Sequence, residues 1–281
     1  MRFLQAIKET FVPSSITTRQ GTDVLPPKPV LPYILIALTL MTLLAAQVTD
    51  FSLIVLIQRL FNFQLGPWGI VKRFFPVDWA YWPEVIAPIL ETIQMSFLGT
   101  LIGSILALPA AYLASQNLTK NKWVVNGVRT TLAVLRTLPI LIYAVFFKLI
   151  FFLGALPGTI AIAVFTFSIV AKMLYERIET LDMKAYYAIE STGATKLKSF
   201  LSALMPEVRP IFYSLSLYAF EINIRYAAIL GYVGAGGIGF ILDNAMKNLP
   251  QNTRTIVILA FIFVTVVIIE NTSRLLRRRL A

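Results

Sequence analysis

Six stretches of apolar residues constrain this chain more than any other feature of its sequence. A helix rises about 1.5 Å per residue, so about twenty apolar residues cover the roughly 30 Å hydrocarbon core of a bilayer. The six stretches are close to this length, and Pro139 interrupts the third. The sequence therefore predicts an all-α integral membrane protein with six transmembrane helices, at residues 31–48, 92–114, 132–153, 159–174, 211–230 and 255–269.

The composition agrees with a membrane protein and excludes several classes of enzyme. Hydrophobic residues make up 57% of the chain and charged residues only 14%, whereas about a quarter of the residues in soluble domains are charged. The absence of cysteine and histidine excludes disulfides, thiol chemistry and histidine-based catalytic or metal sites. The acidic residues are few and isolated, and the sequence contains no nucleotide-binding P-loop. We therefore expect no catalytic residues and no metal site.

The basic residues predict the orientation in the membrane. Six spans place both termini on one side, and that side carries seventeen of the 25 Lys and Arg residues. The opposite side carries five, and three lie within spans: Arg136, Lys148 and Arg225. The positive-inside rule then places both termini and the loop after the fourth span in the cytoplasm. The net charge of +11 thus reflects membrane topology, and we expect no nucleic-acid partner.

The chain divides into a peripheral N-terminal part and a membrane core. Thirty residues precede the first apolar stretch, which is long for a signal peptide, so we expect this helix to stay uncleaved. Trp79 and Trp82 are typical of the membrane interface. The expected order is a cytoplasmic tail, a first transmembrane helix, an extracytoplasmic amphipathic or interfacial segment, a five-helix core and a basic cytoplasmic tail, at residues 1–30, 31–49, 50–90, 91–275 and 276–281.

A polar, basic loop between the fourth and fifth spans predicts two short helices at the membrane surface. Asp182 can cap the first helix, Gly193 suits a sharp turn, and Thr195 can cap the second helix. Apolar residues then recur at helical spacing and predict one apolar stripe: Leu197, Phe200, Leu201, Leu204 and Met205. Two hinged helices of this kind form a docking surface, although an ordinary amphipathic loop would show the same pattern.

Two features of the fifth span and of the residues after it concern function. Glu221 and Arg225 stand four residues apart, so they share a helix face, and a charge within a membrane costs about 2.5–3.5 kcal/mol unless it is paired. The pair either fixes helix packing or places Arg225 in a solute path. The sequence of 234–239 matches G-x-G-x-x-G, but a membrane helix precedes it instead of a strand. We therefore expect a backbone turn near the outer face and not a dinucleotide site.

The loop resembles the coupling loop of ABC importer permeases, E-A-A-x3-G-x9-I-x-L-P. Gly193 and Pro206 stand at the separation found in that family, and Ala188 matches its first alanine. Tyr187 replaces the glutamate and Ile189 the second alanine, and Ala203 and Met205 replace the isoleucine and the leucine. The resemblance implies that these residues meet an ATPase: Tyr187, Ala188, Ile189, Glu190, Gly193, Ala194 and Pro206.

A second stretch, at residues 220–239, is similar to the phosphonate-type branch of these permeases. That branch has a comparable acidic-Asn-Arg helix followed by a glycine run, and the resemblance covers residues from 75 to the C-terminus. It implies the type I importer permease fold, with a translocation path that includes Glu221, Asn223, Arg225, Gly231, Gly234, Gly236, Gly237 and Gly239. Arg136 and Lys148 are expected to extend their charges toward the ends of their span.

The resemblance also implies an assembly and a substrate class. The expected partners are a second copy or a paralogous permease, two cytoplasmic ABC ATPase subunits, an extracytoplasmic substrate-binding protein and membrane lipid. ATP and Mg would bind to the ATPase, so this chain needs no cofactor of its own. The expected location is a prokaryotic inner membrane, and the expected cargo is phosphonate, phosphite or phosphate. An amino-acid or methionine permease and a membrane scaffold without transport activity remain alternatives.

Overall fold

The computed structural model of the chain describes residues 16–17, 23–24, 31–49, 52–62, 67–247 and 252–280. The contacts divide the chain into two units, Met1–Val71 and Lys72–Ala281. Most of the expected N-terminal tail lies outside the described residues.

The first unit contains short elements and one apolar helix. Strands β1 (Ile16–Thr17) and β2 (Asp23–Val24) pair in antiparallel orientation, so this small ladder is an exception to the predicted all-α fold. Helix α2 (Leu31–Val48) coincides with the first predicted span, and most of its described side chains are exposed. Helix α3 (Leu53–Phe61) is capped by Ser52, whose hydroxyl accepts a hydrogen bond from the Val55 N–H at 3.4 Å. Helix α4 (Pro67–Lys72) follows.

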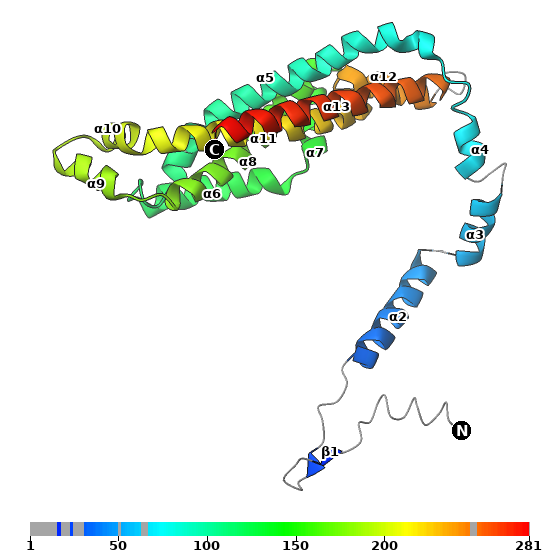
Figure 1. The fold of residues 1–281 in the computed structure, drawn as a ribbon, viewed down its shortest axis with the longest axis horizontal. Helices are drawn as coiled ribbons and strands as arrows, with labels where there is room; N and C mark the ends of the chain where they lie inside the picture. Colours follow the sequence, from blue (N-terminus) through cyan, green and yellow to red (C-terminus); the bar gives the residue numbers. More distant parts are fainter. Residues whose placement is uncertain are drawn as a thin grey trace. The chain divides into compact units, whose positions relative to one another are not determined.

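The second unit is a bundle of long helices with a hinged segment at one end (Figure 1). Helices α5, α8, α11 and α13 run lengthwise through it, and α9 and α10 form the projecting end. The elements are η1 (Trp79–Tyr81), α5 (Trp82–Ala114), α6 (Lys122–Thr137), α7 (Ile140–Phe151), α8 (Ala155–Glu179), α9 (Lys184–Ser191), α10 (Lys196–Ser199), η2 (Phe200–Leu204), α11 (Met205–Leu230), η3 (Gly231–Val233), α12 (Gly237–Lys247) and α13 (Asn252–Leu280).

Small residues let α5 and α8 pack closely. A Cβ atom placed on Gly99 would lie 2.6 Å from Ile162 Cγ2, and one placed on Gly103 would lie 2.5 Å from the Ala163 carbonyl oxygen. Glycines separated by three intervening residues commonly allow close helix approach in membranes. The Gly99-x3-Gly103 pattern is therefore satisfied within this chain.

Proline decides where several helices begin and bend. The predicted span 132–153 breaks at Pro139 into α6 and α7, which meet at 88°. Leu138, the residue before the proline, is extended with ψ of 126°, as steric conflict with the proline ring requires. Pro206, in contrast, lies in the first turn of α11, where its missing N–H is not needed, and the chain stays helical from Lys196 to Leu230. The second loop helix therefore continues into the fifth span, where the sequence indicated two separate helices.

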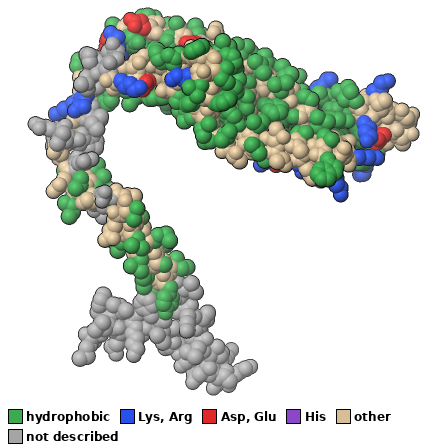
Figure 2. All heavy atoms as spheres, turned by 180° about the vertical axis from the view of Figure 1, so that it is seen from behind, with side chains coloured by type: hydrophobic (Ala, Val, Ile, Leu, Met, Phe, Trp, Pro, Cys, Tyr) green, Lys and Arg blue, Asp and Glu red, His purple; other side chains and the backbone are tan. Residues whose placement is uncertain are grey.

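Among the described residues, three helices are long and apolar enough to cross a membrane: α5, α8 and α13. The number rises to five if the bent pairs α6–α7 and α11–α12 each count as one span. Figure 2 shows hydrophobic side chains over much of the bundle surface, with Lys and Arg mainly at its two ends, one of which α9 and α10 form. The structure therefore supports a helical membrane protein with three to five spans in this count, and the sixth span, at α2, stays a prediction.

Candidate coupling surface and translocation site

The residues 184–204, here called the coupling segment, form the hinged helices that the sequence predicts. Asp182 accepts a hydrogen bond from the Lys184 N–H at 2.9 Å, and this bond lowers the pKa of the Asp182 carboxyl below its usual value. Gly193 has φ of +89° in the turn between α9 and α10. The Thr195 hydroxyl accepts a hydrogen bond from the Lys198 N–H at 3.4 Å. The cap at Thr195 and the hinge at Gly193 are thus confirmed. The predicted cap at Asp182 is wrong by one residue, because the N-cap position of α9 is Met183.

One side of the coupling segment is anchored in the bundle. The Tyr186 side chain of α9 is buried in a cluster formed mainly by α5, α8 and α11. Phe200 packs edge-on against Tyr112 of α5, with 5.1 Å between the ring centroids, and Leu204 is buried. These contacts connect the segment to helices that cross the bundle, so a displacement of the segment would be transmitted to them.

The other side of the segment exposes large apolar side chains. Tyr187, Leu197 and Leu201 are all close to half exposed or more. The predicted single stripe is therefore wrong, because Phe200 and Leu204 are buried while Leu197 and Leu201 are not. The π-helical turn η2 explains the difference, since its wider turn changes the angular spacing of side chains. All seven residues that the sequence assigns to ATPase coupling are exposed or half-buried.

A polar cluster that the sequence did not indicate connects the end of α8, just before the coupling segment, to two other helices. Arg129 of α6 forms a short ion pair with Glu179 of α8, and its Nε donates to the Ala114 carbonyl oxygen at 2.9 Å. The same carboxylate accepts a hydrogen bond from the Gln116 N–H at 2.7 Å. The guanidinium also lies over the Tyr175 ring, 4.6 Å from its centroid. The cluster therefore links α5, α6 and α8 just before the chain enters α9.

The predicted pair of Glu221 and Arg225 is part of a larger network between α11 and α13. An Arg225 nitrogen lies 3.0 Å from a Glu221 oxygen and 3.0 Å from a Glu270 oxygen. Arg277 lies 2.6 Å from the second Glu221 oxygen, and Arg274 lies 2.6 Å from Glu270. Glu270 is the single acidic residue of α13, which is a sequence signal for such a partner. Three arginines and two glutamates leave one formal positive charge in excess.

Asn223 faces a different direction from its two charged neighbours. Its side-chain nitrogen donates to Thr100 Oγ1 at 2.8 Å and to Thr166 Oγ1 at 2.7 Å, and the side chain is buried. Ser96 Oγ donates to the Asn223 carbonyl oxygen at 3.4 Å. Asn223 thus joins α5, α8 and α11 in the core, whereas 45% of the Arg225 side chain is exposed. The structure brings Glu221 and Arg225 together and separates Asn223 from them.

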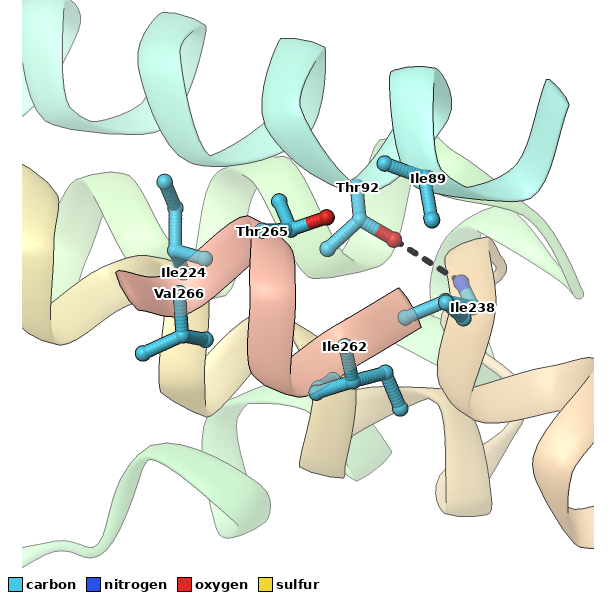
Figure 3. A pocket seen from close by; sticks show the side chains of 8 residues that line it. Ile89, Thr92, Ile224, Ile238, Ile262, Thr265 and Val266 are labelled. Carbon is cyan, nitrogen blue, oxygen red and sulfur yellow. Dashed lines mark hydrogen bonds between the residues drawn. The ribbon is translucent and has the colours of Figure 1, made fainter. Parts of the chain in front are cut away.

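The glycine run 231–239 forms a tight turn at the other end of α11. Gly234, Gly236 and Gly237 have φ of +84°, +76° and +69°, as the sequence predicts for a glycine-dependent turn. A Cβ atom on Gly231 would overlap the Gly239 backbone, and one on Gly239 would overlap the Ala228 carbonyl group. Glycine at both positions therefore allows the end of α11 and the start of α12 to lie close together. The Ile238 N–H donates to Thr92 Oγ1 at 2.8 Å, which fixes the start of α12 against α5 (Figure 3).

A small cavity lies behind this turn, where α5, α11, α12 and α13 meet (Figure 3). Its volume is about 10 Å³, enough for about one water molecule, and half of its lining residues are isoleucines. It cannot hold a solute anion.

Among the described residues, Arg136 has a buried Nη1 without a hydrogen-bond partner and lies two residues before the α6–α7 bend at Leu138.

Comparisons with known proteins identify the class of protein to which this arrangement belongs. Residues 99–281 match the family of binding-protein-dependent transport system inner membrane components. A phosphite transport system permease protein of Stutzerimonas stutzeri is 33% identical over 203 residues, which are 72% of this chain and 74% of the relative. A phosphate-import permease protein of Mycolicibacterium smegmatis is 36% identical over 159 residues, which are 57% of this chain and 30% of that protein.

Solved structures agree with this fold. The chain matches a chain of the MetNI methionine ABC transporter, in an inward-facing conformation, with a TM-score of 0.65 and 20% identity over 73% of this chain and all of that chain. A chain of an amino acid ABC transporter matches with a TM-score of 0.56 and 20% identity over 71% of this chain and 95% of that one. Identities this low show the fold alone.

The chain belongs to the family of binding-protein-dependent transport system inner membrane components. It is therefore a multi-pass inner-membrane permease subunit of an ABC importer, and it is not itself an enzyme. Such permeases bind no cofactor, because a separate ATPase hydrolyses ATP and a separate binding protein presents the solute.

Proposed function

We propose that this permease imports phosphonate or a related phosphorus oxyanion such as phosphite or phosphate. The observation that supports this most is the 33% identity to a phosphite permease across 74% of that protein. Relatives described as phosphate-import and phosphonate permeases fall in the same chemical class. A methionine or amino-acid substrate has support only from fold likeness at 20% identity.

The assembly that we propose contains two permease chains, either two copies or this chain and a paralogue, with two ATPase subunits and one binding protein. In this assembly helix α2 would add a first span to the core, and the excess of basic residues supports a cytoplasmic location for both termini. One chain has too few spans to enclose a translocation path alone, which favours a path between two chains.

ATP-driven closure of the ATPases would act on the exposed side of the coupling segment. Because α10, η2 and α11 form one continuous helical stretch, a push at Leu197 or Leu201 displaces α11 along its length. The Arg129–Glu179 cluster carries the same movement to α6 and its bend into α7. The expected result is alternation between inward-open and outward-open arrangements.

Arg225 is our candidate for the cation that meets the anion. A guanidinium keeps its charge and can hold two oxygens of an oxyanion through parallel hydrogen bonds. Its partner Glu221 is only 10% exposed and is held a second time by Arg277, whereas Glu270 is 33% exposed and is also held by Arg274. An incoming oxyanion would therefore displace Glu270 from Arg225, and Glu221 would stay in place.

The test of the substrate class uses proteoliposomes that contain the complete importer with its binding protein. Phosphite, phosphate and methylphosphonate are compared with methionine for stimulation of ATP hydrolysis and for uptake. We expect at least one phosphorus oxyanion to stimulate both and methionine to stimulate neither. Stimulation by methionine alone would contradict the proposal.

The test of Arg225 compares Arg225→Lys and Glu221→Gln in the same proteoliposomes. Lysine lacks the fork of guanidinium donors, so uptake should fall about tenfold, equivalent to about 1.4 kcal/mol of lost interaction, with the complex still assembled. Glu221→Gln should tighten anion binding and slow release. A structural pair would instead lower thermal stability and leave turnover and substrate dependence unchanged in both variants. Arg254→Lys, at a pair with Asp78 in the same unit, is the control.

A further inference from the structure

An apolar groove of about 730 Å³ runs along the bundle between α5, α11 and α13. Phe97, Leu101 and Ile105 line it from α5, Phe220 lines it from α11, and Leu276 lines it from α13. Phe97 and Ile105 are eight residues apart in one helix, so the groove extends for about 12 Å along the bundle. That length is similar to the hydrocarbon depth of one leaflet, about half of a roughly 30 Å core.

Positive charge lies at one end of this groove. Arg279 of α13 contributes to its lining, and no residue of the lining is acidic. Within the described part of the chain, Arg279 has no ion pair or hydrogen bond, whereas the nearby Arg274 and Arg277 are paired with glutamates. The groove therefore combines a long apolar surface with one unpaired guanidinium, at the end where the four C-terminal arginines lie.

We propose that this groove binds one acyl chain of an anionic phospholipid, with the lipid phosphate at Arg279. The apolar lining matches a hydrocarbon tail and the free guanidinium matches an anionic head group, so both ends of the site fit the same molecule. In the orientation proposed above, Arg279 lies at the cytoplasmic leaflet, where anionic lipids attract basic residues near the surface.

A second copy of the chain fits this groove less well. A two-fold interface uses the same patch on both copies, so the patch must be complementary to itself. A concave groove facing its own copy would remain open, and the lining offers no carboxylate to neutralise Arg279. A bound lipid in this position would contact α11 and α13, which also carry the Arg225 network.

The experiment is native mass spectrometry of the complete importer, equilibrated with equal amounts of phosphatidylglycerol and phosphatidylcholine that have the same acyl chains. We expect about fivefold preferential retention of phosphatidylglycerol, the ratio that one arginine near an anionic lipid supports. Arg279→Gln should abolish this preference. Arg278→Gln, which removes an equal charge from the neighbouring residue outside the groove lining, should leave the preference intact.

Leu101→Trp fills the groove from an exposed position and should lower retention of both lipids while the importer stays assembled. If Arg278→Gln and Arg279→Gln reduce the phosphatidylglycerol preference equally, the lipid is attracted diffusely by the basic residues and the proposed site is wrong. Dissociation of the two permease chains in Leu101→Trp, with no retained lipid in the wild type, would identify the groove as an interface between copies and also overturn it. These readouts do not depend on which solute is transported.

Discussion

The two glycine turns that flank α10, η2 and α11 differ in what surrounds them. Gly193 in the coupling segment has φ of +89°, but a Cβ atom placed on it would meet nothing within 4 Å. Gly236 and Gly237 at the other end also have positive φ, and Cβ atoms on them would lie 2.7 Å from Glu91 Oε1 and 2.6 Å from Thr92 Oγ1. At Gly193 only the backbone conformation restricts which residue fits, whereas at Gly236 and Gly237 neighbouring atoms restrict it as well.

This difference fits two kinds of task. The open turn at Gly193 connects helices whose outer side chains are exposed, as a surface that receives another protein requires. The turn at 231–239, in contrast, packs against other helices of the same chain through its glycines and the hydrogen bond to Thr92. Substitutions should therefore affect assembly at the first turn and the fold of the permease itself at the second.

The largest effect is expected for Gly239→Ala. The new methyl group would overlap the Ala228 carbonyl and the Gly231 Cα, so α11 and α12 would have to separate. We expect a loss of about 3 kcal/mol of stability, the upper part of the usual range for overpacking. Thermal unfolding of the purified permease measures it. Gly127→Ala, at a helical glycine with no atoms within 4 Å, is the control and should be neutral or slightly stabilising.

A smaller loss per substituted residue is expected for the double variant Gly236→Ala with Gly237→Ala. Alanine in the left-handed region costs about 1–2 kcal/mol per residue, and both side chains also press on α5. We expect reduced expression and reduced uptake per folded molecule. Wild-type levels of both would show that this turn adapts easily, and the contrast with Gly193 would then fail.

Gly193→Leu should preserve the fold and disturb the assembly. The left-handed strain of about 1–2 kcal/mol remains, but the side chain meets no neighbour in the permease. We therefore expect weaker association with the ATPase and lost uptake, with a nearly unchanged amount of folded permease in the membrane. Gly193→Asn is the matched control, because asparagine tolerates this backbone conformation. If Gly193→Leu retains full uptake and normal ATPase association, the docking assignment is wrong.

The smallest effect on stability is expected at the Arg129–Glu179 pair. Glutamine keeps an oxygen that can accept the Gln116 N–H and Arg129 hydrogen bonds, so we expect Glu179→Gln to cost about 1 kcal/mol. Its effect on coupling should be clearer: ATP hydrolysis continues while uptake per ATP falls, because α6 no longer follows α8. Lys172 and Glu176 form an exposed pair on α8, so Glu176→Gln is the control. An unchanged ratio of uptake to hydrolysis would limit the cluster to a structural role.

Local chemistry made several parts of the fold predictable. Gly193 and Thr195 marked the hinge and the start of the second short helix because caps and left-handed turns depend on residue type, whereas Asp182 lies one residue before the N-cap of α9. Pro139 marked the break in the third span, and the excess of basic residues indicated one membrane side. The ion pair of Glu221 with Arg225 was predictable because i,i+4 neighbours share a helix face.

Features that depend on the register between helices were not predictable. Glu270 and Arg277 meet Glu221 and Arg225 only because α13 packs antiparallel to α11 with one particular offset. The π-helical turn at 200–204 has no sequence signature, and it exposed Leu197 and Leu201 against the predicted stripe. Similarly, the family resemblance placed Asn223 in the translocation path with the charged pair, but its hydrogen bonds direct it into the core.

Hydrogen–deuterium exchange of the permease in nanodiscs, with and without its ATPase subunits, tests the contrast between the two turns most directly. We predict that ATPase binding slows exchange in 184–199 and leaves 231–240 unchanged, since that turn is already packed within the chain. Slower exchange in 231–240 without any change in 184–199 would place the docking surface at the wrong end of α11 and contradict the account.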